Sequence, residues 1–113
     1  MKVICVPKDK SALRRLDYDL SESDDLIEIY LDSNTLAKLF ELKFFQKIND
    51  VANSNIDDFE DESILGANEL RKVIDSGVFE LNGYDDKLKE VILNIENLFR
   101  QALNLETGIF FFF

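Results

Sequence analysis

The sequence contains no histidine and no tryptophan, and it has one cysteine and one proline. Without histidine the chain cannot carry Ser-His-Asp or Cys-His catalysis, histidine-ligated zinc or a histidine pH switch. The lone cysteine, Cys5, leaves no intramolecular disulfide to form, so a reducing cytoplasm is the expected compartment. Because no cationic cluster stands beside it in the sequence, we expect Cys5 to be a buried small side chain and not a reactive nucleophile.

Long apolar runs and basic residues are also scarce. No stretch approaches the roughly 20 apolar residues of a membrane span, and the apolar part of the N-terminal MKVICVPKDK is too short for a signal peptide. The 13 basic residues face 23 acidic ones, which gives a net charge of −10. This balance disfavours direct binding to nucleic acid or to an anionic membrane, and it favours a basic protein partner.

What the chain does contain is enough apolar mass to fold. Its 113 residues suit a single domain, 1–113, and a hydrophobic share of 46% with 10 phenylalanines argues against disorder. We therefore expect one domain with one core.

Hydrophobic periodicity predicts the order of the elements. The runs at 2–6, 26–31 and 109–113 are predicted strands, of which the first and last are buried on both faces and adjacent in the sheet. Apolar residues at helical spacing predict helices at 34–52, from 61 or 63 to about 75, and at 86–105. Segment 8–20 fits either a helix or a half-buried strand. The expected fold is α+β, a small, mostly buried sheet of about three strands covered by three helices.

Between two of these predicted helices lies an acidic loop, NSNIDDFEDES at 53–63, which contains no basic residue. Asp61, Glu62 and Ser63 are explained by a helix start, since the amides of a helix N-terminus favour carboxylates and caps. Asp57, Asp58 and Glu60 have no such local explanation. We interpret them as a surface for a cationic partner.

A second acidic tract, Glu22 to Asp25, precedes the strand at 26–31. Phe59 and Tyr84 are candidate aromatic anchors for a partner. Phe59 has an alternative role, in which it fixes the loop to the core. The predicted partner-binding residues are Asp57, Asp58, Phe59, Glu60, Asp61, Glu22, Asp24, Asp25 and Tyr84.

The acidic loop also suggests two other kinds of chemistry, metal binding and acid–base catalysis. A calcium loop that starts at Asn53 fails, because Asp58 stands where glycine is needed and Ile64 stands where the bidentate glutamate is needed. Weak divalent binding and carboxylate acid–base catalysis stay as alternatives, although solvated clusters do not readily separate the pKa values of two carboxylates. No catalytic residue, metal site or cofactor is expected.

The phrase IDDFEDESI at 56–64, after a Phe-rich helix, resembles the small acidic immunity proteins that bacteria encode beside the toxins of contact-dependent growth inhibition. This resemblance implies a cytoplasmic inhibitor that binds a cognate basic toxin, often a nuclease, as a monomer in a 1:1 complex. An acidic nucleic-acid mimic or a subunit of a larger assembly would have a similar composition, and both stay open.

Overall fold

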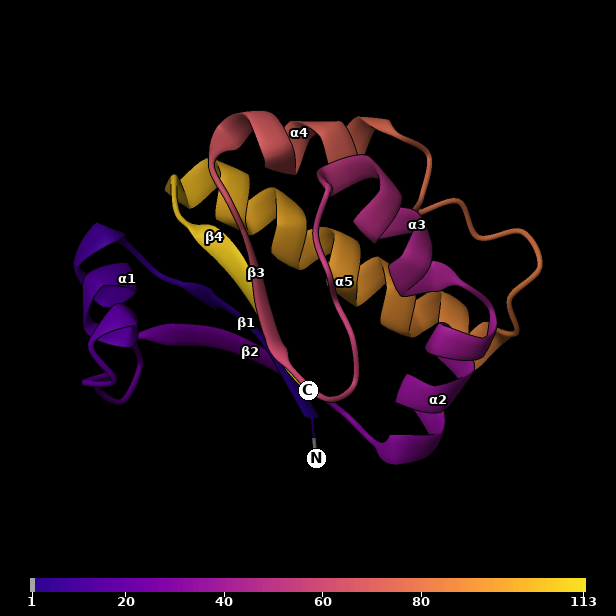
Figure 1. Cartoon of the computed structure of the whole chain (residues 1–113), viewed down its shortest axis with the longest axis horizontal. Coiled ribbons are helices and arrows are strands. Elements are labelled where there is room, and N and C mark those ends of the chain that lie inside the picture. The colour runs from indigo at the N-terminus through magenta and orange to yellow at the C-terminus, as the bar shows by residue number, and fades with distance from the viewer. Residues whose placement is uncertain (1) are drawn as a thin grey trace.

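Four short segments form one antiparallel sheet. In the computed structural model, which describes residues 2–113, these strands are β1 (Lys2–Pro7), β2 (Leu26–Leu31), β3 (Asp61–Leu65) and β4 (Gly108–Phe112). Their order is β2-β1-β4-β3, so the first and last strands pair at the centre of the sheet, as predicted (Figure 1). The α+β class is confirmed.

The core lies on one face of this sheet. Alternation along the strands directs Ile4, Ile109 and Phe111 to this face, and all three are fully buried. Phe111 packs against Phe45 and Phe99, with ring centroids 6.2 and 6.3 Å away. The opposite face therefore receives the alternate residues of the central strands.

Five helices surround the sheet. They are α1 (Lys10–Asp17), α2 (Ser33–Glu41), α3 (Phe44–Ala52), α4 (Ala67–Asp75) and α5 (Asp86–Leu105). Figure 1 shows α2 to α5 together on one side of the strands, with α1 set apart from them beside β1 and β2. The predicted numbers, about three strands and three helices, were too low.

Helix α5 agrees with its prediction at both ends. Asp85 caps it by accepting a hydrogen bond from the Leu88 amide, and the stripe that includes Ile92, Ile95 and Phe99 is buried. Apolar residues at regular helical spacing over 20 residues form one continuous stripe along a helix, which explains why the bounds of α5 could be predicted.

The single helix predicted at 34–52 is wrong. The segment forms α2 and α3, and Lys43 between them adopts a left-handed conformation with φ of 67°. This break lets Leu39 at the end of α2 and the consecutive Phe44 and Phe45 of α3 all become fully buried.

The helix start predicted at 61 or 63 is also wrong. Residues 61–65 form the edge strand β3, in which Ser63 pairs with Phe110 and Ile64 pairs with Ile109. Helix α4 begins only at Ala67, after Gly66 with φ of 90°. Asp61 and Glu62 are therefore edge-strand residues, where charge hinders pairing with another chain.

Segment 8–20, whose sequence fits either a helix or a strand, contains α1. Asp9 caps this helix by accepting from the Ala12 amide at 2.8 Å. The strand predicted at 26–31 is confirmed as β2, which lies at an edge of the sheet.

We expect the Cys5 thiol to be inert in the native protein. The residue is fully buried, and burial, with a smaller contribution from Glu28, raises the pKa of the thiol to about 12. Alkylation by iodoacetamide at pH 7.5 should be at least ~100-fold slower than in 6 M guanidinium, because little thiolate forms and access is blocked. Equal rates in the two solvents would contradict the position of β1 at the centre of the sheet.

Candidate functional site

The acidic loop between α3 and β3 is anchored in the hydrophobic core by one buried residue, Ile56. Ile56 is 3% exposed and belongs to the main hydrophobic cluster. Asn49, on α3, holds the backbone of Ile56 at both polar atoms: its Oδ1 accepts the amide at 2.8 Å, and its Nδ2 donates to the carbonyl at 3.0 Å. The Asn49 Oδ1 also accepts the Ser54 hydroxyl at 2.8 Å. One side chain thus satisfies the polar groups around a buried anchor.

Two carboxylates stabilise the loop, one at the tight turn that forms its tip and one at its base. Asp57 Oδ1 accepts the Phe59 amide at 2.7 Å, and Asp57 pairs with Glu60 in an isolated antiparallel bridge. Glu62, on β3, accepts the Asn55 amide at 2.7 Å. Asp57 therefore has a local structural role, contrary to the expectation from the sequence.

Phe59 projects from this turn with its side chain 87% exposed. The alternative in which Phe59 fixes the loop to the core is wrong, because Ile56 does so. Asp58, Glu60 and Asp61 are exposed around it. Among residues 2–113, no ion pair includes any of the carboxylates at 57, 58, 60 and 61, so the charge around Phe59 is uncompensated within the chain.

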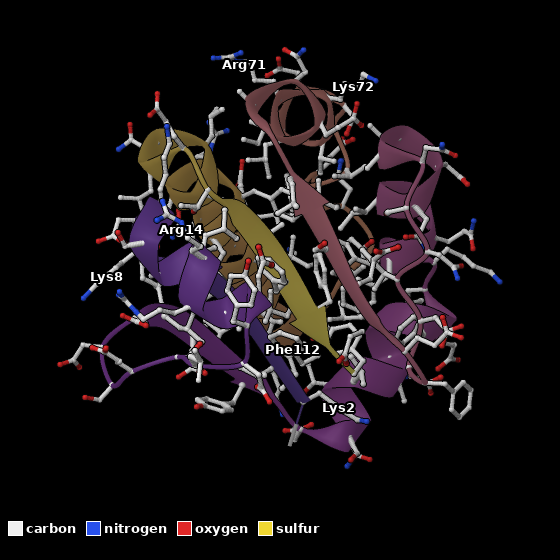
Figure 2. The ribbon with its side chains drawn as sticks, turned by 60° about the vertical axis from the view of Figure 1, so that its left-hand side comes forward. Lys2, Lys8, Arg14, Arg71, Lys72 and Phe112 are labelled. Carbon is white, nitrogen blue, oxygen red and sulfur yellow. The ribbon has the colours of Figure 1, made fainter. Side chains whose placement is uncertain are left out.

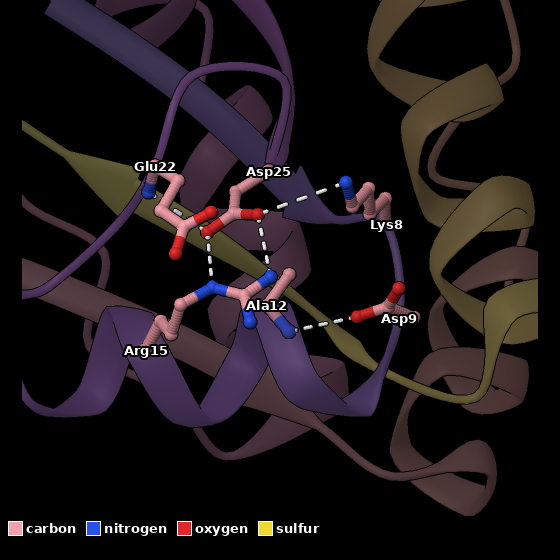
Figure 3. Close-up of polar contacts among 6 residues, drawn as sticks. All are labelled: Lys8, Asp9, Ala12, Arg15, Glu22 and Asp25. Carbon is pink, nitrogen blue, oxygen red and sulfur yellow. Dashed lines mark hydrogen bonds and ion pairs between the residues drawn. The ribbon is translucent and has the colours of Figure 1, made fainter.

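The second acidic tract has a different character, since Asp25 is 1% exposed. The Arg15 guanidinium donates to both of its oxygens at 2.7 Å, the Glu22 amide donates at 2.9 Å, and the Lys8 ammonium lies 3.8 Å away (Figure 3). The hydrogen bonds from Arg15 and then from the Glu22 amide hold the pKa of Asp25 well below its usual range. The same bond raises the pKa of Arg15.

Asp25 is thus neutralised within the fold, and its predicted role in partner binding is wrong because neither of its oxygens faces solvent. Arg15 and Lys8, from the preceding segment, supply this neutralisation. Glu22 and Asp24 remain exposed and keep their candidate role, at a site separate from the acidic loop.

Tyr84, the second predicted anchor, also lies inside. It is 9% exposed, its ring meets Phe44 edge-on at 6.5 Å, and the Lys47 ammonium lies 5.9 Å from the ring centroid. Tyr84 therefore supports the core beneath α3 and cannot act as a surface anchor.

The residue that sequence reasoning missed is Asn49. It stands near the C-terminal end of a predicted amphipathic helix, where a polar residue is ordinary. The available signal was the run of Asn and Ser at 53–55 directly after that helix, whose polar backbone needs partners if Ile56 is to be buried.

A groove of about 680 Å³ lies away from the loop, over α4 and α5, and is lined by Arg71, Arg100 and several amide side chains. Within residues 2–113 no group of three potential metal ligands is assembled.

The helices over residues 2–113 include none that is both long and apolar enough to span a bilayer. Comparison of the chain with protein-family models, with curated proteins and with solved structures finds no match. The geometry of the loop therefore carries the functional interpretation.

We predict that Asn49→Ala lowers the free energy of unfolding by about 2 kcal/mol, because it leaves the Ile56 amide and carbonyl without their partner. Urea denaturation measures this change. Gln46→Ala, which removes only the exposed contact to Asp50 on the same helix, is the control and should change the stability by less than about 0.5 kcal/mol. Similar values for both variants would contradict the role of Asn49.

The Asp25 network predicts a dependence of stability on pH. Because the folded pKa of Asp25 is depressed, its stabilisation is present above the unfolded pKa of about 3.9 and is lost as pH falls below it towards the folded pKa. Asp25→Asn should lower Tm at pH 7 by about 5 °C or more and flatten the profile between pH 5 and 2. Asp32, whose pKa is also lowered by its capping bond to Thr35, adds a slope that both proteins share. Parallel profiles for the two proteins would contradict this assignment.

Proposed function

We propose that this protein is an inhibitor that binds a cationic protein partner through Phe59 and the carboxylates around it. The observation that supports this function best is the 87% exposure of a phenylalanine on a loop anchored by Ile56 and Asn49. A large apolar side chain held in water by an ordered turn suits an anchor that is buried on binding.

The charges around this anchor favour a basic partner. Within residues 2–113, Asp58, Glu60 and Asp61 take part in no ion pair, so they are available for charge-assisted hydrogen bonds with Arg or Lys. A net charge of −10 also steers a cationic molecule towards the protein and raises the association rate at low salt. Because the loop is already held by Asn49, Asp57 and Glu62, little ordering entropy is lost on binding.

The partner that fits these features is a basic toxin of the nuclease type. A nuclease groove is cationic because it holds phosphates, and the carboxylates of the loop would occupy it in their place while Phe59 enters an apolar recess. This agrees with the resemblance of 56–64 to the immunity proteins of contact-dependent growth inhibition. The inhibitor would act in the cytoplasm as a monomer in a 1:1 complex, without catalysis or a cofactor.

We predict that Phe59→Ala weakens binding to the cognate toxin by about 2 kcal/mol or more, because it removes the central anchor. Asp58→Lys with Glu60→Lys should lower the association rate at least ~10-fold in low salt and less in high salt. The product of the adjacent toxin gene is the partner to test, by co-purification, by surface plasmon resonance and by inhibition of its activity.

A control with the same change of charge is Asp75→Lys with Glu90→Lys, at exposed positions of α4 and α5. It should affect binding much less than the loop variant does. Equal losses in the two double variants, or unchanged affinity in Phe59→Ala, would refute the loop as the binding site. Binding without loss of toxin activity would instead indicate an assembly subunit.

A further inference from the structure

The face of the sheet opposite the core is covered only in part. Here β1 and β4 present Val3, Cys5, Phe110 and Phe112, the residues that alternate with the core positions. Helix α1 follows directly after Pro7 and contacts β1, and Cys5 is fully buried. Val3 and Phe112, at the other end of the strands, keep part of their surface in water. Figure 2 shows Phe112 near the C-terminal end of β4.

This open face, defined here as Val3 and Phe112 with their neighbours on the edge strands, has an apolar centre that rests on the buried Phe110. The rings of Phe110 and Phe112 stack with centroids 6.0 Å apart and planes 19° apart. Beside them lies a shallow groove of about 210 Å³, which Asp61 and Ser63 also line. On the other edge, Val3 pairs with Tyr30, whose side chain is 58% exposed.

Carboxylates border this apolar centre on both sides. Asp61 pairs with Phe112 from β3, and Glu28 pairs with Cys5 from β2; both side chains are exposed. Within residues 2–113 neither takes part in an ion pair, although Glu28 accepts the Tyr30 hydroxyl at 3.2 Å. An apolar centre with a charged rim is the usual anatomy of a protein interface.

The negative charges at the edges of the open face indicate which kind of partner it would bind. A second copy of the chain would bring like rims together between two molecules of net charge −10, which opposes association. A segment with cations around an apolar side chain is complementary to both parts of the surface. Asp61 also connects the open face to the acidic loop, because it follows Phe59 by two residues and pairs with Phe112.

We propose that the open face is a second docking surface, which takes an apolar side chain flanked by arginine or lysine from the same basic protein partner. This inference rests on the proposed function for the identity of that partner. It extends the interface from the loop across β4 to Tyr30 on β2, so that the partner would contact the loop and the sheet together.

The test uses a defined probe in place of the partner. The ¹⁵N-labelled protein is titrated at low salt with the peptide Arg-Arg-Leu-Phe-Arg-Arg, and the matched peptide Arg-Arg-Ser-Gly-Arg-Arg measures attraction by charge alone. We expect the first peptide to bind at least ~5-fold more tightly, with the largest amide shifts at Val3, Phe110 and Phe112. Equal affinities, or shifts centred elsewhere, would overturn the proposal.

Two variants complete the experiment. Tyr30→Arg with Ser63→Arg places cations at both edges of the open face and should weaken the first peptide at least ~10-fold. Asn68→Arg with Gln101→Arg makes the same change of charge on exposed positions of α4 and α5 and should leave binding within about twofold. Equal losses in both variants would count against the open face. Concentration-dependent shifts of Val3 and Phe112 without peptide would show a homodimer interface and also overturn the proposal.

The two proposals can fail separately. Asp58→Lys with Glu60→Lys alters the loop and leaves the residues of the open face unchanged, so the peptide should still shift Val3 and Phe112 in that variant. If the loop variant keeps its toxin affinity while the peptide result holds, only the proposed function fails.

Discussion

The structure depends on placing one strand, β4, between two others with one of its faces in the core. All five of its residues pair with β3, three of them also pair with β1, and Ile109 and Phe111 are fully buried. Phe111 belongs to a group of aromatic rings that also includes Phe45, Phe99 and Phe113, in which neighbouring centroids lie 5.3 to 6.3 Å apart. A strand this apolar is stable only when covered, and the helices α2 to α5 supply that cover.

The candidate site follows from this arrangement through a short chain of contacts. β4 provides the ladder for β3, β3 carries Glu62, and Glu62 holds the Asn55 amide at the base of the loop. From the other side, α3 contributes Asn49, which holds Ile56. The exposed Phe59 is thus supported by two elements that are themselves fixed by the core.

Carboxylates in the two acidic tracts differ in whether a cation of the same chain neutralises them, and their surroundings explain the difference. The Asp25 carboxylate is bound by Arg15, Lys8 and a backbone amide, so its charge is neutralised within the fold and its role is structural. Asp58 and Glu60 meet no cation within residues 2–113. Net charge alone did not distinguish these cases, because among the predicted partner-binding carboxylates of residues 2–113 only Asp25 is paired, with Lys8 and Arg15.

Much of the fold could be predicted from local pattern, and the failures have physical causes. Helix α5 and strands β1, β2 and β4 carry strong periodicity or continuous apolar runs. β3 was mistaken for a helix start because Asp, Glu and Ser suit both an N-terminus and a protected edge strand, and only its partner β4 decides between them. The left-handed Lys43 and the burial of Tyr84 depend on tertiary packing that no local signal carries. For the site, the exposure of the loop carboxylates at 58 and 60 agrees with the prediction, whereas the internal pairing of Asp25 required a contact across ten residues.

The pairing of β1 with β4 also has a consequence for how the protein reaches its native state. The Thr107 hydroxyl donates to the Pro7 carbonyl, a bond between residues 100 positions apart, and the central ladder lies beside it. During synthesis β1 and β2 can pair early, but the edge of β1 that pairs with β4 stays free until nearly all of the later helices have followed. Until then this edge is open to chaperones and to other nascent chains, so the sheet closes late.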